Sequence, residues 1–143
     1  MGASVSVYWP GISEEQVESQ PGFYNDCKAW GDWMAEREEH RDVLDILERL
    51  GVSALCTFKT DGVSDSEVAW VTPADLEAAA MRLRNLVLAN HPDTRRILET
   101  YGKSRNDVGS LVEEFAQDLS AVAGLASFAA QEGASRITLE VNW

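Results

Sequence analysis

Both ends of the chain alternate apolar with polar side chains, and this alternation is the period of a half-buried β-strand. In residues 3–9 the apolar positions are Ala3, Val5, Val7 and Trp9, and in residues 136–143 they are Ile137, Leu139 and Val141. Shorter alternations at 52–58 and 67–71 flank a turn that contains Asp61 and Gly62. We therefore expect two terminal strands and a central hairpin.

Between these strands the apolar side chains recur every three or four residues, which predicts amphipathic helices. Ser13 and Gln16 form a capping box that starts a short helix ending near Gln20. Residues 25–50 follow a helical pattern whose apolar stripe changes face, so we expect a kink or break between 36 and 40. Three further helices are expected at 72–88, 94–101 and 108–132.

This order of elements predicts one α+β domain over residues 1–143. Strands at the two termini commonly pair within one sheet, so we expect a mixed or antiparallel sheet of about four strands with helices packed mainly on one face. A chain of 143 residues can bury a core of its own. The sequence shows no internal repeat, linker or low-complexity stretch.

Charge is the most unusual property of the composition. Twelve basic and 24 acidic side chains give a net charge of −12. The segment 13–50 holds eleven acidic and four basic side chains, a balance of −7, whereas the segment 72–105 has a balance of +2. Phosphate backbones and anionic membrane surfaces are bound by Lys and Arg, so neither nucleic acid nor membrane is expected as a partner.

The rest of the composition indicates the source of the protein and its cellular compartment. Arginine outnumbers lysine nine to three, which is typical of a GC-rich genome and indicates a bacterial source. No apolar run approaches the roughly 18 residues that span a bilayer, and the first residues lack the basic start and apolar block of a signal peptide. We therefore expect a cytoplasmic protein.

The titratable side chains form no recognisable catalytic motif. Glu36, Glu39 and His40 sit at spacings of three and four, so a helix would place Glu36 and His40 on one face. The di-iron pattern Glu-x-x-His is absent, however, and interleaved arginines favour an ion-paired surface over a metal site. His91 before Pro92 is more typical of a helix-ending turn than of a general base. Cys27 lies among acidic groups, which oppose thiolate formation. No catalytic residue, metal or cofactor is predicted.

Aromatic side chains concentrate in the first 33 residues, beside the acidic segment. They either form a second patch of core or anchor a partner, because Trp and Tyr are favoured at interfaces. Our leading hypothesis is a non-enzymatic immunity or inhibitor protein that binds a basic protein. The predicted partner-binding residues are Trp30, Trp33, Glu36, Glu38, Glu39 and Asp42.

Two alternatives stay open at this point. One is a small-molecule enzyme or ligand-binding domain whose pocket lies between sheet and helices, with His91, His40 or Cys27 contributing polar chemistry. The other is a homodimer with the tryptophan cluster at its interface. Neither has a spacing of residues that forces two functional groups to meet.

Several segments resemble one family. They are the opening Met1-Gly2, the acidic step 12–16, the helix start 71–76, and the segments 114–119 and 128–133 that lead to the final strand. Together they look like the uncharacterised YfbM-like bacterial proteins, over roughly the last 75 residues and the first 16. The resemblance implies an α+β fold and no assigned activity.

Overall fold

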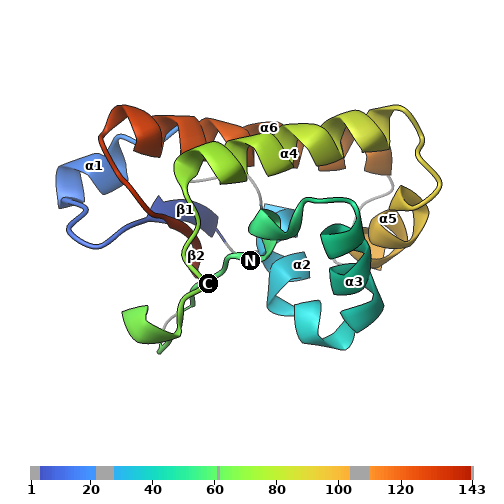
Figure 1. The fold of residues 1–143 in the computed structure, drawn as a ribbon, viewed down its shortest axis with the longest axis horizontal. Helices are drawn as coiled ribbons and strands as arrows, with labels where there is room; N and C mark the ends of the chain where they lie inside the picture. The colour runs from blue at the N-terminus through green and yellow to red at the C-terminus, as the bar shows by residue number, and fades with distance from the viewer. Residues whose placement is uncertain (1–3, 22–27, 61, 104–109, 143) are drawn as a thin grey trace.

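The computed structural model describes residues 4–21, 28–60, 62–103 and 110–142. Two long helices, α4 (Pro73–Leu88) and α6 (Leu111–Gln131), lie side by side, run in opposite directions and span the length of the molecule (Figure 1). The shorter elements are β1 (Ser4–Tyr8), α1 (Glu14–Glu18), α2 (Lys28–Ala35), α3 (Arg41–Arg49), α5 (Thr94–Lys103), β2 (Thr138–Asn142) and the 3₁₀ helices η1 (Arg37–Glu39), η2 (Ser53–Cys56) and η3 (Asp65–Glu67). The α+β class is confirmed.

The terminal strands pair as the alternation predicts. β1 and β2 are antiparallel, with Val5 opposite Val141 and Val7 opposite Leu139. All four of these side chains are buried in the same core as those of α4 and α6. Within the described residues the sheet has these two strands, so the prediction of about four strands is wrong.

The central hairpin is the part of the prediction that fails. Residues 53–56 form the 3₁₀ helix η2, and in the segment 67–71 only Val71 pairs, opposite Ile137, the residue that precedes β2. Lys59 pairs with the same free edge of β2: its N–H donates to the Leu139 carbonyl over 2.8 Å, and its carbonyl accepts from Val141. The edge of β2 is therefore covered at two points by a loop, without a third strand.

Leu55 explains why 52–58 is not a strand. An alternation that buries Val52, Ala54 and Cys56 would leave Leu55 on the opposite face. A 3₁₀ helix instead places residues three apart on one side, so Val52 and Leu55 are both fully buried. Burying two large aliphatic side chains outweighs the weak strand preference of the segment.

The predicted helix starts at Ser13 and Thr72 and the predicted break are confirmed, whereas the starts expected near Asn25 and Val108 lie outside the described residues. Ser13 and Gln16 make both bonds of the capping box, and the Thr72 hydroxyl accepts from the Asp75 amide. The helical pattern of 25–50 divides into α2, η1 and α3, which agrees with the change of apolar face near 36–40. Gly51 follows α3 with a φ of 77°, a conformation that glycine adopts without a steric penalty.

An aromatic cluster fills the core between α2, α5 and α6. Phe115 contacts the rings of Trp30, Trp33 and Tyr101 at centroid distances of 4.7–5.8 Å, in tilted or edge-to-face arrangements. The Trp33 indole N–H also donates to the Thr100 hydroxyl over 2.8 Å. Aromatic side chains bury large apolar areas and prefer these geometries, so the cluster holds the three helices together.

The outer edge of β1 is satisfied by one side chain. The Gln20 amide accepts a hydrogen bond from the Val7 N–H over 2.7 Å and donates to the Val7 carbonyl over 3.0 Å. Gln20 is only 5% exposed. Its amide therefore occupies the place of a neighbouring strand for one residue of β1, because buried backbone groups require partners.

Candidate functional site

The predicted partner-binding carboxylates lie on residues 36–42, which we call the acidic turn. It connects α2 to α3 through η1, and its backbone bonds run from the Glu39 N–H to the Glu36 carbonyl and from the His40 N–H to the Arg37 carbonyl. These bonds fix the direction in which the side chains leave the turn. The acidic turn is thus a defined surface of the fold.

The four carboxylates of this turn are exposed. The exposed side-chain fractions are 49% for Glu36, 69% for Glu38 and 54% for Asp42, and Glu39 is also exposed. The solvent face of α3 continues this surface with Asp45 and Glu48. The acidic part of the predicted set is therefore accessible to a partner.

The two tryptophans of the predicted set have a different position. Trp30 is 1% exposed and Trp33 is 2% exposed, and both pack on Phe115 inside the core. They belong to the core patch that the sequence analysis held as the alternative. The reason is their large apolar area, which α2 buries against α5 and α6. Neither offers a surface to a partner in this fold.

Tertiary ion pairs join the acidic segment to the basic one. The Arg96 guanidinium donates to the Asp42 carboxylate over 2.7 Å, and Arg49 lies 3.8 Å from Asp93. The hydrogen bond from Arg96 holds the pKa of Asp42 below its ordinary value. The charge asymmetry between 13–50 and 72–105 is thus partly neutralised within the molecule.

The arginines of the acidic turn are used in different ways. Arg41 pairs with Glu38 over 3.5 Å, as the interleaved pattern predicts. Arg37 is directed inward: it donates to the Met34 carbonyl over 3.2 Å and its guanidinium lies 4.2 Å from the centre of the Phe58 ring. The predicted surface ion pairing is therefore confirmed for Arg41 with Glu38, whereas Arg37 is directed inward and does not follow the prediction.

Glu36, Glu39 and His40 come together on the turn. One ligand atom from each of the three side chains lies within 4.8 Å of the others, and His40 Nε2 is 3.9 Å from Glu36 Oε2. The His40 side chain is 11% exposed. The geometry therefore brings an imidazole and two carboxylates to one point.

The other residues named for chemistry have structural surroundings. His91 Nδ1 accepts a hydrogen bond from the Asp93 N–H over 3.2 Å, and the Thr94 hydroxyl donates to the His91 carbonyl. These bonds organise the start of α5. Burial raises the pKa of the Cys56 thiol, although Arg37 opposes this effect, so the thiol is protonated at neutral pH. Cys27 lies outside the described residues.

Two hollows in the described surface bear on the expected ligand pocket. One, of about 390 Å³, is open to solvent between Trp9 and the segment 132–136. The other lies beneath His40, against Trp33 and Leu47, and is too tight to hold a water molecule. The second hollow is thus a packing gap that cannot hold a substrate.

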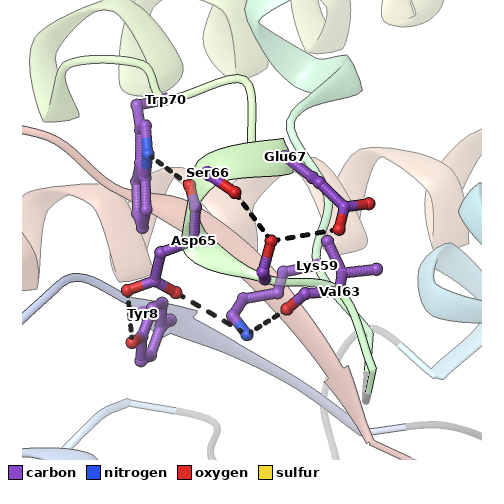
Figure 2. A network of polar contacts seen from close by, with 8 residues as sticks. Tyr8, Lys59, Val63, Asp65, Ser66, Glu67 and Trp70 are labelled. Atoms are coloured by element: carbon purple, nitrogen blue, oxygen red, sulfur yellow. Dashed lines mark hydrogen bonds and ion pairs between the residues drawn. The ribbon is translucent and has the colours of Figure 1, made fainter.

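A second polar cluster, which the sequence analysis did not predict, ties the loop 57–71 to the polar face of the sheet. Figure 2 shows the Asp65 carboxylate between the Tyr8 hydroxyl and the Lys59 ammonium, at 3.2 and 3.8 Å. The Trp70 ring stacks on Tyr8 at 6.1 Å and is covered by Arg136 at 4.9 Å. Tyr8 and Asp65 are 57 residues apart in the sequence and belong to no motif, so only the fold reveals the cluster.

Tyr8 is expected to ionise above the ordinary tyrosine value of about 10. Burial and then the charge and hydrogen bond of Asp65 raise the pKa of Tyr8. Because the pKa of Tyr8 is higher in the folded state than in the unfolded state, the protonated phenol stabilises the fold fully at any pH below the unfolded-state pKa. This stabilisation is lost as the pH rises through the folded-state pKa. Absorbance at the phenolate band, measured against pH, should show a late component that Tyr8→Phe removes.

Asp65→Asn provides the control for that titration. It removes the Asp65 contributions and leaves the desolvation of Tyr8 in place. The late component should then move to lower pH without vanishing. An unchanged titration in the Asp65→Asn variant would contradict the assignment.

The chain was compared with protein-family models, with curated proteins and with solved structures, and none of the three comparisons found a match. The resemblance to the YfbM-like proteins therefore stays a prediction. Within the residues described, no helix combines the length and the apolar character needed to cross a membrane.

Proposed function

We propose that the chain is a non-enzymatic protein-binding domain of the immunity or inhibitor kind, which engages a basic partner through the acidic turn. The observation that carries the proposal is the exposure of Glu36, Glu38, Glu39 and Asp42 on a hydrogen-bonded turn. A fixed set of carboxylates on a chain of net charge −12 attracts a cationic surface and orients it on approach.

The buried tryptophans change the character of this proposed contact. Interfaces that bind tightly usually contain aromatic anchors, and here Trp30 and Trp33 are part of the core. The proposed binding therefore depends mainly on charge. It should weaken strongly as salt is added, because salt screens interactions between exposed charges.

The alternative, an enzyme or ligand-binding domain, is the weaker proposal. His91 Nδ1 already accepts a backbone hydrogen bond, the tight hollow at His40 cannot hold a water molecule, and the Cys56 thiol is protonated at neutral pH. None of these groups is poised as a base or nucleophile.

Affinity capture from the native bacterial host tests the proposal. The triple variant Glu38→Gln, Glu39→Gln, Asp42→Asn should lose a partner that the unaltered chain retains at low salt and releases at high salt. The matched control, Glu15→Gln, Glu77→Gln, Glu113→Gln, changes the net charge equally on α1, α4 and α6 and should retain the partner. Capture of no stoichiometric partner, or equal loss in both triple variants, would overturn the proposal.

A further inference from the structure

The structure points to a divalent metal site on the acidic turn, and we propose that Glu36, Glu39 and His40 bind a zinc ion. The inference concerns a ligand of the free chain and does not rest on the proposed protein partner. Its starting point is the convergence of one imidazole and two carboxylates, whose ligand atoms lie within 4.8 Å of one another.

The state of the His40 ring provides an independent observation. Nε2 is buried and has no hydrogen-bond partner, and it lies 3.9 Å from Glu36 Oε2. A buried imidazole nitrogen normally has a partner. A metal ion between His40 and Glu36 would supply one, since neutral imidazole is a common metal ligand.

The distances fit a first-row metal after small side-chain movements. Zinc lies about 2.0–2.2 Å from nitrogen and carboxylate ligands, so two ligand atoms at a tetrahedral angle are about 3.4 Å apart. The Nε2–Oε2 distance of 3.9 Å has to shorten by about half an ångström, and a pair at the outer limit of 4.8 Å would have to shorten by about 1.4 Å. Glu36 and Glu39 are exposed and can rotate, while the backbone of η1 stays in place.

The neighbouring arginine side chains do not occupy the proposed metal position. Arg41 is paired with Glu38, and Arg37 is held by the Met34 carbonyl and the Phe58 ring. In a regular helix both arginines could pair with these glutamates, which is why the residue spacing favoured an ion-paired surface over a metal site. The turn through η1 is not a regular helix, and it brings Glu36 and Glu39 to His40 instead.

The donor set selects the class of ion. One nitrogen and two carboxylate oxygens suit zinc and related first-row metals, whereas Mg²⁺ and Ca²⁺ prefer sites built entirely from oxygen. Three protein ligands leave a position of a four-coordinate ion for water. The ion would also balance the two carboxylate charges, and the negative field of the chain favours its approach.

Titration of the purified full chain with zinc chloride tests this site. The chain contains two histidines, so nitrogen-15 spectra of their imidazole rings report both at once. We expect one zinc ion per chain in calorimetry, with the His40 signals shifted and those of His91 unmoved. Magnesium chloride should leave both unmoved. The same titration in a Cys27→Ser, Cys56→Ser background excludes binding by thiolates.

Three variants decide the outcome. Glu39→Gln and His40→Gln should each weaken zinc binding at least about tenfold, and His91→Gln, the matched histidine removal, should leave it unchanged. Glu39 is exposed, so this variant serves if His40→Gln does not fold. Zinc binding that survives both substitutions, or no shift of His40 at millimolar zinc, would overturn the site. Neither result bears on capture of a basic partner.

Discussion

Replacing Phe115 with alanine is expected to lower the free energy of unfolding by about 3–5 kcal/mol. Phe115 is fully buried and contacts the rings of Trp30, Trp33 and Tyr101. Its removal leaves a cavity where three helices meet, and the surrounding rings are too rigid to fill it. Domains of this kind are stable by only about 5–15 kcal/mol, so the loss is a large part of the total.

Urea unfolding, followed by tryptophan fluorescence, measures this loss. Leu88→Ala on α4 is the matched control, because the Leu88 side chain is 45% exposed and should cost less than about 1 kcal/mol. Equal losses in the two variants would show that the aromatic cluster is not the centre of the core.

Gln20→Ala is expected to destabilise the protein by about 2–4 kcal/mol. The substitution leaves both the N–H and the carbonyl of Val7 buried without a partner. Each such group costs about 1–3 kcal/mol. The free energy of unfolding in urea measures the loss.

Gln20→Glu should be destabilising at neutral pH and recover as the pH falls. An ionised carboxylate can accept from the Val7 N–H but cannot donate to its carbonyl, whereas a protonated one can do both. Burial therefore raises the folded pKa of this glutamate above its unfolded value of about 4.3. The protonated glutamate therefore stabilises the fold fully at any pH below its unfolded-state pKa, and this stabilisation is lost as the pH rises through its folded-state pKa.

Two controls accompany the glutamine experiment. Gln117→Glu makes the same chemical change at an exposed position of α6 and should stay within about 0.5 kcal/mol at any pH near neutrality. Gln20→Ala should show no such recovery in acid. If Gln20→Glu is as stable as the unaltered chain at pH 7, the buried double hydrogen bond does not exist in solution.

The acidic turn was predictable only in part. The composition of residues 36–42 and their helical break identify an exposed acidic surface, because charged side chains avoid burial and the apolar stripe changes face there. The pairing of Asp42 with Arg96 bridges 54 residues and has no local signal. The inward position of Arg37 depends on Phe58, which the fold brings beside it.

The sequence by itself determined the features with short-range causes. Ser13 and Thr72 cap helices through bonds to residues three positions on, and the apolar period of α6 fixes which face is buried. The terminal alternations determined β1 and β2, because one register buries Val5, Val7, Leu139 and Val141 together.

Only the tertiary structure decided what depends on partners distant in sequence. Residues 53–56 became a 3₁₀ helix because burying Leu55 with Val52 outweighed an alternation that would have exposed it. Trp30 and Trp33 became core because α5 and α6 supplied Tyr101 and Phe115. Gln20 completed the edge of β1 at Val7, 13 residues away, since this contact forms only after the surrounding elements have packed.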